Sequence, residues 1–164
     1  MFAFSKRRFA AAVLSAILLP AAAASDTTGT ASPRRVEAEL LDGTHYSLGD
    51  SRSGLTVLSF WSPDSLASRK CIWELQRFAS AYESRGVATV AVSTLKDTGL
   101  LSAFVAKRKL QLPVAILEDH DLGALPEHLM PIVHVFDKDG RLLASRAGLY
   151  SYRSLEALVV PLLK

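Results

Sequence analysis

The chain has 164 residues, of which 21% are charged, and this length allows one domain and excludes a large multidomain enzyme. Lys and Arg number 19 against 16 Asp and Glu, and the excess lies in Lys6, Arg7 and Arg8, because the first 24 residues contain no acidic residue. The rest of the chain is neutral. We therefore expect no nucleic-acid partner, since counterion release requires a basic patch that the mature protein keeps.

The N-terminal segment has the pattern of a secretory signal peptide. A basic start is followed by the apolar run 9–19, which at 11 residues is shorter than the roughly 20 that cross a bilayer. Residues 22–24 are all alanine and offer a site for signal peptidase. We predict a signal peptide at 1–24, a flexible leader at 25–35 and a periplasmic protein with no stable membrane span. An uncleaved anchor is the alternative.

The mature chain alternates between strand and helix patterns. Alternating or apolar β-rich runs predict strands at 36–41, 44–48, 55–61, 87–93, 132–136 and 141–145. Helical spacing and capping residues predict helices at 66–85, 98–110 and 154–163, with one helical turn at 122–125. Residues 114–117 are a short apolar run, and the acidic run that follows at 118–121 predicts a solvated turn.

These elements predict one α/β domain at 36–164. Strands 55–61 and 87–93, joined by helix 66–85, form a βαβ unit with a right-handed crossover. Asp42-Gly43 is a hairpin turn signal, so the domain opens with an N-terminal β-hairpin, and a second hairpin after residue 131 extends the sheet antiparallel. We expect a central mixed β-sheet with helices on both faces.

Three segments of the domain carry a resemblance to a known family. They are Asp42-Gly43 with Tyr46-Ser47-Leu48, then Leu58-Ser59-Phe60-Trp61, and finally the segment from Met130-Pro131 to Asp139-Gly140. At these separations they resemble the TlpA/ResA-like family of exported thiol oxidoreductases. The resemblance covers residues 36–164 and implies a thioredoxin-like fold with a cis peptide bond before Pro131.

The chain departs from this family at the reaction centre. The family has Cys-x-x-Cys three residues after Phe-Trp, and here these positions hold Ser65 and Ser68. A cysteine at a helix N-terminus has a lowered pKa, and disulfide exchange needs a second sulfur to resolve the mixed disulfide. A serine hydroxyl supports neither step. We predict that Ser65 and Ser68 cap the helix and carry no redox chemistry.

Cys71 is the single cysteine of the chain, and three interpretations of it stay open. Helical spacing places it near Leu75 and Phe78, which favours a buried, inert thiol. Ser68 stands where the peroxiredoxin motif Pro-x-x-x-Thr/Ser-x-x-Cys has its hydroxyl residue, although Pro63 is one position early, and this would make Cys71 peroxidatic. An unpaired cysteine in an exported protein can also form a mixed disulfide or a Cys71–Cys71 dimer.

Two other kinds of site are less well supported by the sequence. The chain has no Gly-x-Ser-x-Gly elbow of a serine hydrolase. Cys71, His128, Met130 and His134 are residue types that bind copper or zinc. However, related exported copper carriers use a Cys-x-x-x-Cys pair, which is absent here. We predict no metal and no cofactor.

The expected function is polypeptide binding. In the family, the cis-proline loop offers backbone groups to an extended peptide, and this β-augmentation needs no sulfur. The residues expected to form such a groove are Trp61, Pro63, Leu66, Met130 and Pro131. We predict a non-catalytic binding or accessory module for exported polypeptides, monomeric or weakly dimeric. The alternative is a thiol-disulfide oxidoreductase or peroxidase that acts through Cys71.

Overall fold

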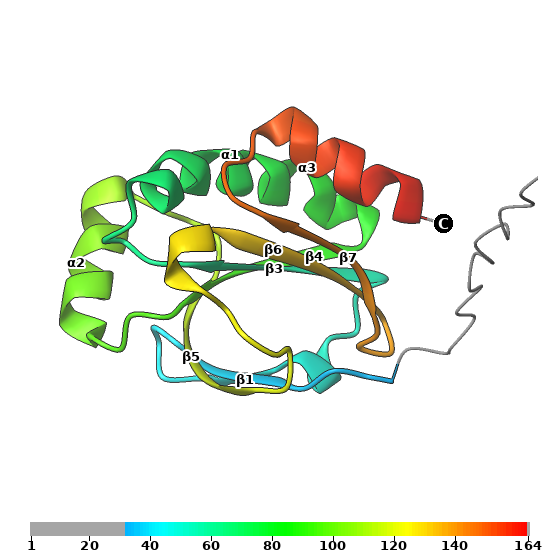
Figure 1. The fold of residues 1–164 in the computed structure, drawn as a ribbon, viewed down its shortest axis with the longest axis horizontal. Helices are drawn as coiled ribbons and strands as arrows, with labels where there is room; N and C mark the ends of the chain where they lie inside the picture. The colour runs from blue at the N-terminus through cyan, green and yellow to red at the C-terminus, as the bar shows by residue number, and fades with distance from the viewer. Residues whose placement is uncertain (1–31, 164) are drawn as a thin grey trace, which may run out of the picture.

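The computed structural model describes residues 32–163 and places them in one mixed sheet with helices packed beside it (Figure 1). The seven strands have the order β2-β1-β5-β4-β3-β6-β7. They are β1 Val36–Leu40, β2 His45–Ser47, β3 Leu55–Trp61, β4 Val87–Ser93, β5 Val114–His120, β6 Ile132–Asp137 and β7 Leu142–Ala147. The α-helices are α1 Leu66–Tyr82, α2 Thr98–Arg108 and α3 Tyr152–Val159, and short 3-10 turns lie at Leu48–Asp50, Glu83–Arg85, Glu127–Leu129 and Val160–Leu162.

The predicted signal peptide and most of the predicted leader lie outside the described residues. Within residues 32–163, no helix is long and apolar enough to cross a bilayer.

The β3 strand lies inside the sheet and leads directly to the candidate site. All of its residues are buried, and it pairs in parallel with β4 and antiparallel with β6. Strands that are apolar on both faces are typical of a sheet covered on both sides. The bounds of β3 and β4 match the predicted strands, and α1 joins them as the predicted βαβ unit.

The N-terminal hairpin is confirmed. Gly43 adopts a φ of 84°, a left-handed conformation that glycine tolerates because it has no Cβ. The Leu40 N–H donates to the Thr44 carbonyl oxygen at 2.8 Å, which closes the turn.

Two hydrophobic cores lie on opposite sides of the sheet. The first contains the buried apolar residues of all three α-helices, including Phe78 of α1, Leu101 of α2 and Leu155 of α3. The second contains no residue of these helices. The predicted mixed sheet is therefore confirmed, but the helices lie on one face rather than on both. The reason is that β3, β4 and β5 follow one another in the same direction across the sheet, so right-handed crossovers place α1 and α2 on the same face.

The second core is closed by the outer strands and a loop. In Figure 1, β1 and β5 lie below the central strands, and Val36 of β1 belongs to the same core as Phe60 of β3. Leu122 and Leu125 pack against this core from the loop after β5. That loop is not helical at 122–125, so the predicted helical turn there is wrong.

Most other bounds agree with the prediction to within about three residues, but β5 and the start of α3 differ for reasons that the structure shows. Residues 118–120 form the end of β5 rather than a solvated turn, because antiparallel pairing with β1 extends through them. The α3 helix begins at Tyr152, two residues before its predicted start. Ser151 is its N-cap and forms a capping box with Ser154, the residue at which the prediction placed the start.

Candidate functional site

The candidate site lies at the carboxyl end of β3, where α1 begins. Ser65 is the N-cap of α1, and its Oγ accepts a hydrogen bond from the Ser68 N–H at 3.2 Å. This bond satisfies one of the N–H groups that the first turn of a helix leaves free. Ser68 is 1% exposed, and its Oγ accepts from the Ser62 N–H at 3.4 Å. The predicted capping role is confirmed for Ser65, whereas the Ser68 hydroxyl bonds the turn before the helix and caps none of its N–H groups.

The cis peptide bond predicted before Pro131 is present. Thr94, directly after β4, connects this bond to β3. Its N–H donates to the Trp61 carbonyl oxygen at 3.0 Å, and its Oγ1 donates to the Met130 Sδ at 3.5 Å. The carboxyl ends of β3 and β4 therefore meet the start of β6 at one end of the sheet, which is where open α/β sheets form binding sites.

A shallow depression of about 410 Å³ joins these elements. It is lined by Ser62, Asp64, Ser65, Thr94, Leu95, Glu127, His128 and Met130. The structure thus brings Ser65 and Met130 to one surface. The sequence prediction missed Thr94 and Glu127. The position of Thr94 at the end of a buried strand is the signal that points to it, because neighbouring parallel strands end at the same edge.

Four of the five predicted groove residues do not line this depression: Trp61, Pro63, Leu66 and Pro131. Pro131 is buried. Trp61 is 1% exposed and packs on Phe104 with ring centroids 5.4 Å apart. The prediction that Trp61 contacts a bound peptide is therefore wrong, because its side chain lies in the core. The alternation along β3 explains this, because it turns the Trp61 side chain toward the helices. Leu66 is 60% exposed at the start of α1. The Pro63 carbonyl oxygen accepts a hydrogen bond from Arg69 at 2.7 Å, which ties the turn to the helix.

Cys71 points away from this surface into the first core. It is 1% exposed, its thiol donates to the Tyr150 carbonyl oxygen at 3.4 Å, and its sulfur accepts from the Tyr150 N–H at 3.2 Å. Burial raises the pKa of the Cys71 thiol, and the hydrogen bond from Tyr150 offsets this only in part. A thiol that is both protonated and enclosed is a poor nucleophile. This geometry fits the interpretation of Cys71 as a buried structural residue.

The four residues considered as metal ligands do not come together in one place, since only His128 and Met130 line the same depression. Cys71 belongs to the first core, whereas His134 lies between Phe60 and Phe136 on the side of the second core. His128 is exposed on the 3-10 turn Glu127–Leu129. Burial lowers the pKa of His134, so the imidazole is held neutral. Among residues 32–163, no cluster of three His, Cys, Asp or Glu side chains is arranged to hold a metal ion.

A helix that starts directly after an inner strand, beside a cis-proline that opens the adjacent antiparallel strand, defines a thioredoxin-like fold. Solved structures share it. A thiol:disulfide interchange protein of the thioredoxin family from Chlorobium tepidum superposes with a TM-score of 0.68 at 16% identity, over 82% of this chain and 97% of that one. A secreted thiol-disulfide isomerase from Corynebacterium glutamicum gives 0.67 at 18% identity, over 79% and 83%.

StoA from Bacillus subtilis gives a TM-score of 0.60 at 20% identity, over 77% of this chain and 97% of that one. No family model matches the chain, and no curated protein matches it in sequence. The thioredoxin-like fold expected from the sequence is confirmed, and the structures that share it are thiol-disulfide oxidoreductases.

Proposed function

We propose that this chain is an exported protein of the TlpA/ResA type that binds polypeptides at the Ser65–Met130 depression and performs no dithiol chemistry. One observation carries the proposal. Ser65 and Ser68 stand at the helix start beside the cis-proline. Cys71, the single cysteine of the sequence, is buried on the inner side of the same helix.

The chemical argument concerns the resolving step. Disulfide exchange passes through a mixed disulfide that a second thiolate must release, and the reaction begins from an accessible thiolate. At this helix start the side chains supply hydroxyls, which form no disulfide. Cys71 has a raised pKa and its sulfur already contacts the Tyr150 backbone.

Polypeptide binding is supported by exposed apolar side chains around the depression. Leu66, Leu129 and Leu149 are 60%, 42% and 58% exposed. The Gly148 N–H donates to the carbonyl oxygens of Leu129 and Pro131 at 3.0 and 2.9 Å, so the loop that carries Leu149 adjoins the cis-proline segment. Apolar side chains that gather around a depression on a surface are typical of a binding site.

Export is supported by the signal-peptide pattern at 1–24 and by the secreted origin of the Corynebacterium glutamicum protein that shares the fold. In the periplasm such a module would hold an exported polypeptide during folding or assembly. The loss of both sulfurs would prevent it from becoming covalently trapped on cysteine-containing clients.

The first experiment separates binding from catalysis. Insulin reduction and peroxide turnover are measured for the parent protein and for Cys71→Ser. We expect no turnover above the rate without protein in either case. Turnover in the parent that disappears in Cys71→Ser would overturn the proposal and establish the thiol-dependent enzyme instead.

The second experiment tests the binding surface. Fluorescence anisotropy of a labelled, reduced and alkylated unfolded protein reports the affinity. Leu66→Ser removes apolar area beside the depression and should weaken binding about tenfold, since burying a leucine contributes on the order of 1.5–3 kcal/mol and 1.4 kcal/mol is tenfold. The matched control is Leu143→Ser, because Leu143 is 43% exposed but lies on β7 near the opposite end of the molecule. Equal affinities of the two variants would reject this surface.

A further inference from the structure

The edge of β4 that faces β5 is open over half its length. β4 pairs with β3 along all of residues 87–93, but β5 pairs with it only at 91–93. Residues 87–90 therefore have no strand partner on the β5 side. An open strand edge presents backbone donors and acceptors at the spacing of a β-ladder, which makes it a template for another extended chain.

The direction of the backbone groups identifies the residues at this edge. The Ala91 N–H donates to the Pro113 carbonyl oxygen at 2.9 Å, so the backbone of Ala91 faces the β5 side. Backbone groups along a strand alternate between its two edges, so those of Val87 and Thr89 face the same open side. In addition, the Thr89 hydroxyl is buried and has no hydrogen-bond partner. A buried polar group without a partner is uncommon in a folded protein.

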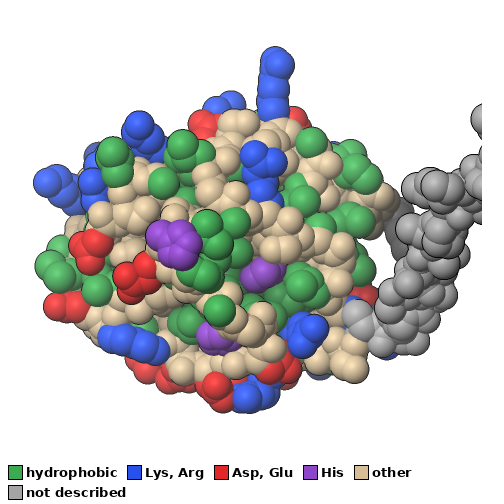
Figure 2. Space-filling model, viewed as in Figure 1, with side chains coloured by type: hydrophobic (Ala, Val, Ile, Leu, Met, Phe, Trp, Pro, Cys, Tyr) green, Lys and Arg blue, Asp and Glu red, His purple; other side chains and the backbone are tan. Residues whose placement is uncertain are grey.

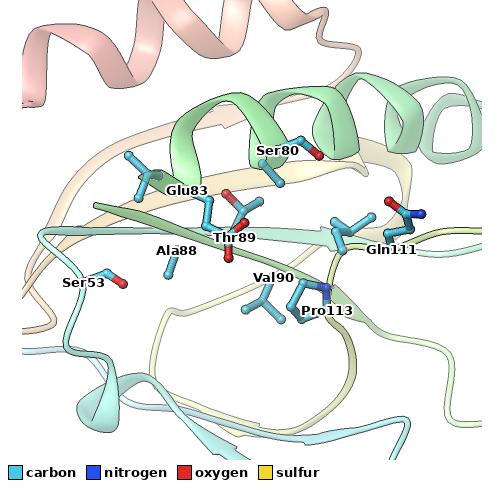
Figure 3. A pocket seen from close by; sticks show the side chains of 11 residues that line it. Ser53, Ser80, Glu83, Ala88, Thr89, Val90, Gln111 and Pro113 are labelled. Atoms are coloured by element: carbon cyan, nitrogen blue, oxygen red, sulfur yellow. The ribbon is translucent and has the colours of Figure 1, made fainter. Parts of the chain in front are cut away.

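A cavity of about 510 Å³ follows this open edge. It is lined by residues from both faces of β4, which is possible only where the edge between them is uncovered. Figure 3 shows Ala88 and Val90 on the side of β4 away from α1, with Ser80 and Glu83 on the α1 side. Residues 111–113 close the far end, just before β5 begins.

The charge at the rim indicates which segment fits. Glu83 is exposed at this cavity, and no Lys, Arg or His of the described residues lies within ion-pair distance of its carboxylate. A carboxylate beside unpaired backbone groups favours an extended peptide that carries a Lys or Arg side chain. Four residues of strand extend roughly 13 Å, so the fitting segment is short.

We propose that the β4 edge at 87–90 binds a short extended polypeptide segment as an added strand, with a Lys or Arg of that segment opposite Glu83. This site is independent of the proposed function. Residues 87–90 pair with 55–58, at the amino end of β3, whereas Ser65 follows its carboxyl end. Each site can therefore fail without the other.

The test uses a capped hexapeptide of alternating valine and threonine with one central lysine, titrated into ¹⁵N-labelled protein. We expect the largest amide shifts at Val87 and Thr89. Two further peptides carry N-methyl groups on alternate backbone nitrogens. One is methylated at the odd positions and the other at the even positions. In an added strand only one set of N–H groups faces β4, so one methylated peptide should lose binding while the other keeps it.

Equal binding of the two methylated peptides, or shifts confined to the Ser65 end, would overturn strand addition. No binding of the unmodified peptide would overturn it as well. A second measurement tests the charge: Glu83→Gln should weaken the lysine peptide about threefold and leave unchanged a peptide with threonine in place of lysine. Glu39→Gln, at an exposed position of β1, is the matched control. An unchanged affinity in Glu83→Gln would reject the role of Glu83.

Discussion

The start of α1 should still activate a thiol placed there. In Ser65→Cys, made in the Cys71→Ser background so that one thiol remains, the introduced sulfur occupies the position of Ser65 Oγ, which accepts the Ser68 N–H at 3.2 Å. A hydrogen bond to a charged acceptor contributes about 1.5–3 kcal/mol against about 1 kcal/mol for a neutral one. The helix dipole adds about 0.3–1 kcal/mol. At 1.36 kcal/mol per unit, a thiolate stabilised by about 2 kcal/mol has its pKa lowered from about 8.5 to about 7.

The assay is a pH titration of the ultraviolet absorbance of the thiolate. The matched control is Ser145→Cys in the same background, because Ser145 is exposed on β7, away from any helix start. We expect the Ser65→Cys midpoint to lie one to two pH units below that of the control, as the free energies above predict. Coincident midpoints would refute the reasoning, because they would show that the first turn of α1 offers no stabilisation to an anion at this position.

Three further outcomes follow from buried groups. Cys71→Ala leaves the Tyr150 N–H without its buried acceptor and should lower the free energy of unfolding in urea by about 1–3 kcal/mol; an unchanged value would show that the contact contributes nothing. Burial lowers the pKa of His134 from its ordinary 6.5, so the unfolded chain binds more protons and the free energy of unfolding falls as pH drops through about 6.5. His134→Phe should flatten this dependence in urea titrations between about pH 7.5 and about pH 5, whereas exposed His128→Asn should retain it, and equal slopes would contradict the assignment. Phe78→Ala, at a fully buried position of the first core, should cost about 3–5 kcal/mol in the same urea assay, and a loss below about 1 kcal/mol would show that the core closes around the cavity.

Electrostatics distinguishes the two sides of the molecule. The charged residues of α1, α2 and α3 are mainly basic: Arg69, Lys70, Arg77, Lys107, Arg108 and Arg153, against Glu74 and Glu156. Strands β1, β2 and β5 carry Glu37, Glu39, Glu118 and Asp119 and no Lys or Arg. In Figure 2, blue side chains are more frequent along the upper side and red ones along the lower side, although both colours occur on each side. The neutral total of residues 25–164 therefore hides an uneven distribution of charge.

The elements that the sequence located best are those whose signal is local. β3 and β4 are apolar runs bounded by turn residues, and their bounds match the prediction. The start of α1 follows from a serine that can cap it, which needs only neighbouring residues. The prediction failed at 118–120, where acidic residues form a strand because β1, some 80 residues earlier, pairs with them.

The start of α3 shows the same limit. Both Ser151 and Ser154 are suitable N-cap residues, and the sequence alone gives no preference between them. In the folded chain, the backbone of Tyr150 is held against Cys71, and the Tyr152 N–H donates to Glu74 at 2.7 Å. These contacts with α1 fix where the helix begins.

The sequence by itself determined which residues are apolar, where the first hairpin turns and where α1 is capped, and that positions 65 and 68 carry serine hydroxyls. The tertiary structure decided that all three α-helices share one face, that Trp61 lies in the core, and that half of the β4 edge is left open. The spacing of apolar residues in the sequence indicates only which side chains must be buried. Which element covers them, and which backbone edge is left without a partner, depends on segments far apart in the chain that meet only when it folds.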